Sequence, residues 1–147
     1  MENNNQNQKE KKLINYDKVL SVKCDTLWDF FNIWLKLIPT LKLREKELEI
    51  ASRMLEVWYK LSKKYDDKQD LLTIFNSTKV REEIAEKCGI NQSNFNVNLT
   101  NLKKTGFCYD VGDKNRSTAI NNRYIPDFDE SERSFCFILN FKINEGL

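Results

Sequence analysis

Two short stretches in the second half of this chain, each followed by a glycine, most constrain what it can fold into. They cover residues 78–88 and 92–105, and Gly89 and Gly106 follow them. In both stretches apolar residues recur every three or four positions, the spacing that places them on one face of an α-helix. These inner positions are Val80, Ile84 and Cys88, and then Phe95, Leu99 and Leu102. Because glycine adopts the left-handed conformation after a helix end at no steric cost, the sequence predicts two helices that each end at a glycine.

The turn between these two helices is short. Ile90 is expected to fill the core, and Asn91 is a residue type that caps a new helix through its side-chain oxygen. Ala85 is small, which would let the two helices cross closely. Two helices joined by a three- or four-residue turn that contains glycine are the signature of a helix-turn-helix.

A β-hairpin is predicted directly after the second helix. Residues 107–111 are expected to form its first strand and residues 112–118 its loop. Residues 119–125 would form the return strand, which Pro126 ends. The basic residues of this hairpin are Lys114, Arg116 and Arg123.

From Ile90 to Cys108 the chain resembles the recognition-helix segment of winged helix-turn-helix transcription regulators. That family combines a polar N-cap, an apolar residue, Leu-x-x-Leu, a basic pair, a glycine and two apolar residues that open a strand. The matching residues are Asn91, Phe95, Leu99, Leu102, Lys103, Lys104, Gly106, Phe107 and Cys108. Residues 43–50 similarly resemble the first helix of such domains, so the likeness spans residues 43–126, about half the chain. It implies a mainly α fold with a small antiparallel β-sheet, here a winged helix-turn-helix with an extra N-terminal helix and a C-terminal strand.

The resemblance implies that the second helix enters the major groove of DNA. The base-reading residues it implies are Gln92, Ser93, Asn94, Asn96, Val97 and Thr100. The phosphate-binding residues it implies are Asn101, Lys103, Lys104, Lys114, Arg116 and Arg123. Asparagine and glutamine can bond bidentately to adenine and a valine can contact the thymine methyl group, so an A·T-rich duplex fits this surface best.

The N-terminal part of the chain is predicted to be a polar tail followed by one helix. Residues 1–14 are expected to be disordered, because their polar leader cannot bury surface. Within residues 15–40, Thr26 can cap a helix that Pro39 ends. Trp28 and Leu35 lie off its main apolar face, and would pack either against a partner chain in a homodimer or between two helices of the same chain.

Three further elements are expected within residues 41–147, the predicted winged helix-turn-helix domain. Residues 43–65 form a long helix whose inner stripe is Leu48, Ala51, Met54, Leu55, Trp58 and Leu61. Residues 70–75 could form a helical turn or a short strand, and the pattern does not decide. Residues 134–143 alternate apolar and other residues, which predicts a strand.

The charge of the chain does not by itself indicate a nucleic-acid partner. Twenty-four basic and 22 acidic residues give a net charge of +2. Between Asn91 and Tyr124 five basic residues face two acidic ones, so positive charge gathers modestly in the proposed binding region. The predicted recognition helix has no arginine, and Val97 stands where such proteins often place a basic or polar side chain that reads bases.

Two functions follow from these observations. The first is a DNA-binding transcription regulator, dimeric through Trp28 and Leu35. The alternative is a non-catalytic protein-interaction or assembly module that uses the winged-helix shape without reading DNA sequence. A short asparagine-rich leader before a single winged-helix unit is similar to small uncharacterised bacteriophage proteins, which fits the alternative.

Enzyme, metal, cofactor and membrane functions are not expected. The chain has no histidine, no glycine-rich phosphate loop and no Gly-x-Ser-x-Gly motif. Its cysteines, Cys24, Cys88, Cys108 and Cys136, form no Cys-x-x-Cys pair, so we expect reduced thiols rather than a zinc site. The chain shows neither a signal peptide nor a run of 18 apolar residues. The sequence therefore predicts a cytoplasmic protein, in the bacterial host if phage-encoded.

Overall fold

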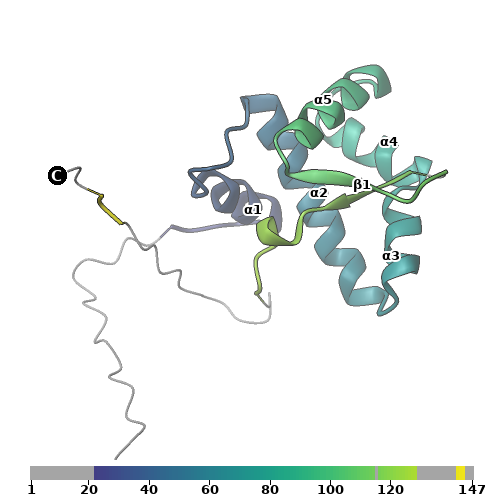
Figure 1. Ribbon diagram of the computed structural model, residues 1–147, viewed down its shortest axis with the longest axis horizontal. Helices are drawn as coiled ribbons and strands as arrows, with labels where there is room; N and C mark the ends of the chain where they lie inside the picture. Colours follow the sequence, from purple (N-terminus) through teal and green to yellow (C-terminus); the bar gives the residue numbers. More distant parts are fainter. Residues whose placement is uncertain (1–21, 115, 129–141, 145–147) are drawn as a thin grey trace, which may run out of the picture.

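The computed structural model describes residues 22–114, 116–128 and 142–144. In these ranges the chain forms five α-helices, a two-stranded antiparallel sheet and a short 3-10 helix (Figure 1). In chain order they are α1 (Leu27–Lys36), α2 (Glu45–Lys64), α3 (Lys68–Phe75), α4 (Thr78–Lys87), α5 (Gln92–Lys104), β1 (Cys108–Val111), β2 (Ser117–Ile120) and η2 (Asn122–Tyr124). The mainly helical fold with a small antiparallel sheet is therefore confirmed.

Helix α2 is the centre of the fold, and α1, α3, α4 and α5 all contact it. Its buried apolar residues are Ile50, Ala51, Met54, Leu55, Trp58 and Tyr59. The predicted inner stripe was thus correct at four positions, whereas Leu48 and Leu61 lie only partly buried at the margin of the core. A helix enclosed by four others buries more than one stripe, which explains why Ile50 and Tyr59 are also inside.

Helix α1 is capped as the sequence predicts, and it is hydrogen-bonded to the segment that follows β2. The Thr26 hydroxyl accepts a hydrogen bond from the backbone N–H of Asp29, and the Asp29 carboxylate accepts one from the backbone N–H of Thr26. The indole N–H of Trp34 donates to the backbone carbonyl of Tyr124 at 2.8 Å. Leu35 is only 1% exposed within this core. The prediction that Leu35 forms a partner interface is therefore wrong, because the chain's own helices cover it.

Both glycines end their helices through the same hydrogen-bond pattern, so the helix-turn-helix forms as predicted. Gly89 has φ +65°, and the N–H of Ile90 bonds the carbonyl of Ala85 at 3.0 Å. Gly106 has φ +83°, and the N–H of Phe107 bonds the carbonyl of Leu102 at 3.2 Å. In each case the residue after the glycine reaches back over the last helical turn, which is the Schellman motif.

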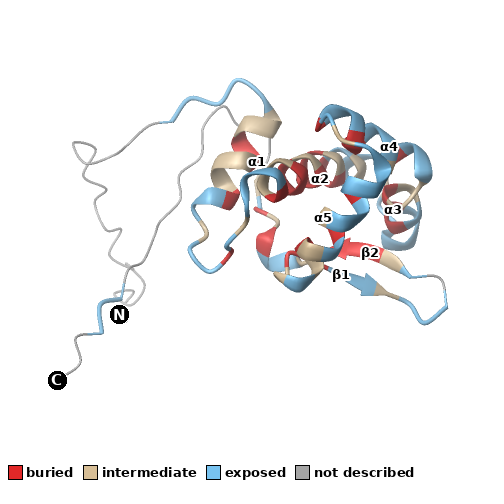
Figure 2. Ribbon diagram, turned by 90° about the horizontal axis from the view of Figure 1, so that it is seen from above, coloured by how far each residue is buried: buried red, intermediate tan, exposed pale blue. Residues whose placement is uncertain are grey.

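The hairpin follows α5 directly, and its two strands pair from Cys108 with Ile120 to Val111 with Ser117. Its return strand is shorter than predicted, because β2 ends at Ile120 and the chain turns into η2. Asn121 causes this ending: its side-chain oxygen accepts from the N–H of Arg123, and its amide donates to the carbonyl of Gly106. Figure 2 shows the exposed loop of the hairpin extending away from the helices.

Asn76, directly after α3, binds the outer side of β2. Its side-chain oxygen accepts from the backbone N–H of Thr118 at 2.7 Å, and its amide donates to the carbonyl of the same residue at 2.9 Å. A neighbouring strand would pair with both backbone groups of a residue in this way. One asparagine side chain thus takes the place of a third strand. The undecided segment 70–75 belongs to α3, which Asp67 caps.

Two expectations fall wholly or mainly outside the described residues. The polar tail over residues 1–14 lies outside them, and so does most of the expected strand over residues 134–143. Lys142 and Ile143, which are described, carry no strand.

Candidate nucleic-acid interface

Helix α5 turns one complete face outward. Phe95, Leu99 and Leu102 anchor its inner side, all three buried as predicted. The predicted base-reading residues all lie on the exposed side: Gln92, Ser93, Asn94, Asn96, Val97 and Thr100. Val97, the one large aliphatic residue among them, is 60% exposed.

Local hydrogen bonds hold three polar side chains of α5 and its N-cap against the helix backbone. The Asn91 side-chain oxygen accepts from the N–H of Asn94 at 2.8 Å and so caps the helix. The amide of Asn98 donates to the carbonyl of Asn94, and the hydroxyl of Thr100 donates to the carbonyl of Asn96. Asn98, which the sequence did not single out, is partly buried. The side-chain amides of Gln92, Asn94 and Asn96 make no hydrogen bond to another described residue that the structure records, so they are the best placed to bind outward.

The predicted phosphate-binding residues do not form one group. Lys104, Lys114 and Arg116 are exposed, at the end of α5 and in the hairpin loop. Arg123 is exposed too, but it belongs to η2, at the opposite end of the hairpin from that loop, with its guanidinium 6.0 Å from the centre of the Tyr124 ring. Asn101 is only partly exposed. Lys114 and Arg116 thus lie at the loop end of the hairpin, whereas Lys104 and Arg123 lie toward its base, where Asn121 bonds Gly106.

Lys103 forms an ion pair with an acidic residue of β1. Its ammonium lies 2.7 Å from a carboxylate oxygen of Asp110 on β1. The hydrogen bond from Lys103 holds the pKa of Asp110 below its ordinary value, and the charges of Arg116 and Arg81 act in the same direction. Asp110 is therefore ionised at neutral pH and offsets part of the positive charge beside α5.

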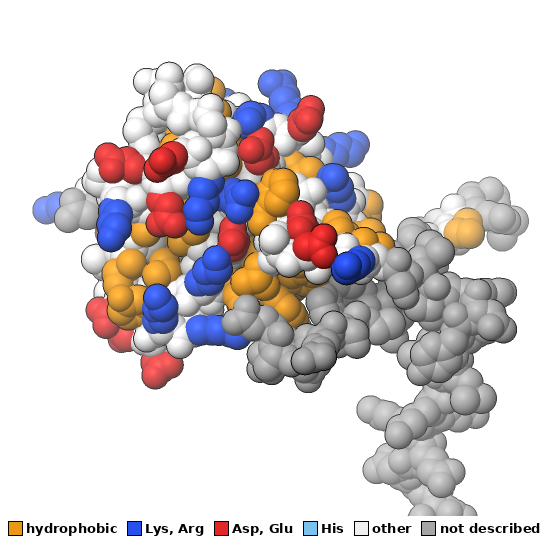
Figure 3. All heavy atoms as spheres, turned by 180° about the vertical axis from the view of Figure 1, so that it is seen from behind, with side chains coloured by type: hydrophobic (Ala, Val, Ile, Leu, Met, Phe, Trp, Pro, Cys, Tyr) orange, Lys and Arg blue, Asp and Glu red, His pale blue; other side chains and the backbone are white. Residues whose placement is uncertain are grey.

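The face of the molecule that is seen from behind Figure 1 has a mixed charge pattern. Figure 3 shows Lys and Arg side chains interspersed with Asp and Glu rather than gathered in a field of one sign. Ion pairs of this mixed kind are recorded on α2, where Arg53 and Lys60 bind Glu56 and Lys46 binds Glu49. This side of the molecule therefore offers no single-sign surface for an anionic polymer.

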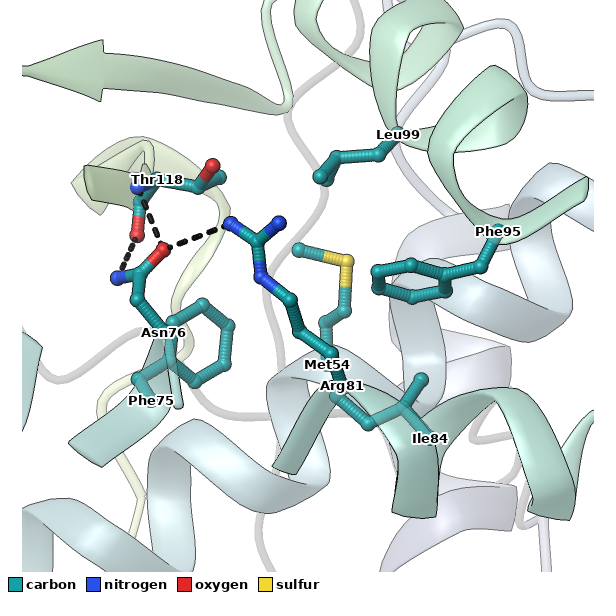
Figure 4. Close-up of a pocket in the computed structure, with 8 residues that line it drawn as sticks. All are labelled: Met54, Phe75, Asn76, Arg81, Ile84, Phe95, Leu99 and Thr118. Carbon is teal, nitrogen blue, oxygen red and sulfur yellow. Dashed lines mark hydrogen bonds between the residues drawn. The ribbon is translucent and has the colours of Figure 1, made fainter. Parts of the chain in front are cut away.

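A small cavity lies where α2, α3, α4, α5 and β2 meet (Figure 4). Its volume is about 10 Å³, which suits no more than one water molecule. The lining residues are Met54, Phe75, Asn76, Arg81, Ile84, Phe95, Leu99 and Thr118. Arg81 donates from its guanidinium to the side-chain oxygen of Asn76 at 3.2 Å. Sequence reasoning missed Arg81 and Asn76, because only folding brings them beside β2.

Trp28, the other predicted partner residue, is partly covered by its own chain. The guanidinium carbon of Arg53 lies 4.6 Å from the centre of the Trp28 ring, close enough for a cation–π contact. The ring N–H is buried and has no hydrogen-bond acceptor among the described residues. An interface through Trp28 stays a prediction, now without Leu35.

The described cysteines lack the features of reactive or metal-binding thiols. Burial raises the pKa of Cys88 to about 11 and that of Cys108 to about 12. Thiolates are the reactive and metal-binding form, so these two remain protonated at neutral pH. Cys24 is exposed, and Cys136 lies outside the described residues. Within the described ranges no three His, Cys, Asp or Glu side chains are grouped to hold a metal ion.

Comparison with known proteins gives no relative. No family model, no curated protein and no solved structure matches the chain. In the part of the chain that the structure describes, no helix combines the length and apolar character needed to cross a membrane.

Proposed function

We propose that this chain is a DNA-binding protein that lays α5 in the major groove and the β1–β2 hairpin along the sugar–phosphate backbone. More particularly, we propose a transcription regulator that reads A·T-rich sites. The observation that carries the proposal is the outward face of α5, which is exposed and neutral, with Lys104 at its C-terminal end and Lys114 and Arg116 in the loop of the hairpin that follows. Side-chain amides read base edges and cations hold phosphates.

The number of available cations sets how tightly one copy can bind. If Lys104, Lys114 and Arg116 each neutralise one phosphate, the slope of log affinity against log salt is about −2.7. Such binding is weak at physiological salt, so the proposal includes a homodimer that places two α5 helices on one duplex. Helix-turn-helix dimers contact half-sites one helical turn apart.

The test is a fluorescence-anisotropy titration with a labelled A·T-rich duplex between 50 and 200 mM salt. The test variant changes Lys104, Lys114 and Arg116 to Ala. The matched control changes Lys36, Lys64 and Lys68 to Ala, which removes the same charge from exposed residues on α1, α2 and α3. We expect salt-sensitive binding that the test variant loses and the control keeps. No binding by the folded parent at micromolar concentration and 50 mM salt would reject the proposal.

One observation favours the alternative, a non-catalytic interaction or assembly module. The exposed residues of α5 before its last two positions include no cation, and Val97 is an apolar side chain at the centre of that face. A neutral surface with a central aliphatic residue also suits a protein partner. A site-specific photo-crosslinker at position 97, used in the cell that expresses the protein, separates the two: DNA adducts support the regulator and a protein adduct supports the module.

A further inference from the structure

An ion pair joins the recognition helix to the hairpin at the edge of the proposed DNA surface. Lys103 on α5 and Asp110 on β1 meet at 2.7 Å, and their side chains remain 30% and 34% exposed. The pair is thus tight, yet it stays in reach of a ligand. Neither residue is needed to fill the core, because the inner positions of α5 are apolar.

Asp110 faces further positive charge on its own side of the hairpin. Its cross-strand partner is Thr118, and directly paired residues of two antiparallel strands project to the same face. Thr118 and Arg81 both line the small cavity. Figure 4 shows the Arg81 guanidinium directed toward Thr118. Arg116 directly precedes β2. Lys103 thus contacts this carboxylate directly, and the charges of Arg116 and Arg81 also lower its pKa.

This arrangement is what a bound backbone phosphate would require. Carboxylate and phosphate oxygens accept the same charge-assisted hydrogen bonds from lysine and arginine. We infer that Lys103 forms a seat for one DNA phosphate, and that the Asp110 carboxylate occupies this seat in the free protein and so lowers DNA affinity. Arg81, held by Asn76, adds positive charge behind the seat without leaving its place. The inference rests on the proposed function.

The substitution Asp110→Asn tests it, because asparagine keeps the shape and removes the charge that holds Lys103. The control is Asp113→Asn, which removes the same charge from an exposed residue of the hairpin loop that has no ion pair with a described residue. Both are titrated with the A·T-rich duplex at 50 and 200 mM salt, after circular dichroism shows that they melt as the parent does. If Asp110→Asn gains one phosphate contact, its slope of log affinity against log salt concentration (the salt slope) becomes steeper than that of the parent by about 0.9. Its affinity then falls about 3.5-fold more than that of the parent over this fourfold rise in salt.

Lys103→Ala shows whether the gain comes from this lysine. In the parent we expect it to leave the salt slope unchanged, because Asp110 already engages Lys103. Combined with Asp110→Asn, it should return the slope to that of the parent.

Two results overturn the inference, and they differ in what they leave standing. If the parent binds DNA but Asp110→Asn and Asp113→Asn behave alike, the seat does not exist and the proposed function survives. If neither the parent nor Asp110→Asn binds at 50 mM salt, both the inference and the proposed function fail.

Discussion

Asn96 and Asn98 lie two positions apart on α5, yet they differ in what they can contact. Asn96 is exposed, whereas Asn98 is partly buried and donates to the carbonyl of Asn94 at 2.8 Å. If α5 reads bases, Asn96→Ala removes a contact worth about 1–3 kcal/mol on a selected site. Asn98→Ala should change affinity far less. The measurement is anisotropy on a duplex selected from a random library, with an unselected duplex as reference. Equal losses for the two variants would mean that α5 is not docked as proposed.

Asn76 replaces a strand with one side chain, which makes it a sensitive position for stability. Asn76→Ala leaves the backbone N–H and carbonyl of the buried residue Thr118 without these partners. Burying unpaired polar groups costs about 1–3 kcal/mol each, so we expect the free energy of unfolding to fall by at least about 1 kcal/mol. Urea denaturation measures the loss. Asn122→Ala, at an exposed position of η2, is the control, and a loss as large there would contradict this role for Asn76.

The crossing of α4 and α5 depends on a small residue in α4. Ala85 is 2% exposed, and its carbonyl accepts a hydrogen bond from the backbone N–H of Ile90, just after the end of α4. Ala85→Leu should destabilise the fold by about 1–3 kcal/mol through overpacking. Glu86→Leu adds an apolar side chain at the next, exposed position and should cost less. If the two variants melt at the same temperature in a calorimeter, Ala85 is not at a tight crossing.

The middle of α2 carries a charge network with a predictable response to acid. Burial of Glu56 raises its pKa, but the hydrogen bonds from Lys60 and Arg53 outweigh burial and leave the pKa below its ordinary value of 4.5. A carboxyl with a lower pKa in the folded than in the unfolded state stabilises the fold above its unfolded pKa, and this stabilisation is lost as the pH falls through the folded pKa.

The variant Glu56→Gln tests this response. It should be less stable than the parent at pH 7, and the difference in unfolding free energy should shrink between about pH 5 and pH 3. Chemical denaturation at each pH measures it, with the exposed Glu82→Gln as control. A difference that stays constant with pH would show that Glu56 does not contribute through its charge.

Features of a helix or strand can be predicted from the sequence when the residues that cause them are close together in the chain. The ends of α4 and α5 follow from Gly89 and Gly106, and the inner face of α5 follows from the spacing of its apolar residues, so all of these were predictable. Asn76 and Thr118 are 42 residues apart in the chain, and no local sequence pattern predicts that they pair. For Leu35 the sequence left a partner chain and a second helix of the same chain as alternatives, because nothing in its neighbourhood says which helix will cover it. The ion pair of Lys103 with Asp110 joins two elements whose relative placement only the folded chain fixes.

For the whole molecule, a net charge of +2 on 147 residues leaves affinity for DNA to a few local side chains. This is why we expect two copies to act together. Sedimentation equilibrium between 1 and 100 μM should show a dimer, and Trp28→Ala should weaken it if Trp28 takes part. Lys36→Ala, an exposed residue elsewhere on α1, should leave the dimer unchanged. A monomer over the whole range, in the presence of the duplex as well, would exclude the dimeric regulator.

The hydrogen bond from Trp34 to the carbonyl of Tyr124 joins residues 90 positions apart. On a ribosome that adds about 5–20 residues per second, the acceptor is made roughly 5–18 s after the donor. Helix α1 can meet α2 early in synthesis, but its attachment to the end of the hairpin must wait until the helix-turn-helix and both strands have been translated. Of the described helices, the first to be made is thus among the last to reach its final contacts, and the nascent chain carries the Trp34 indole without this partner during that interval.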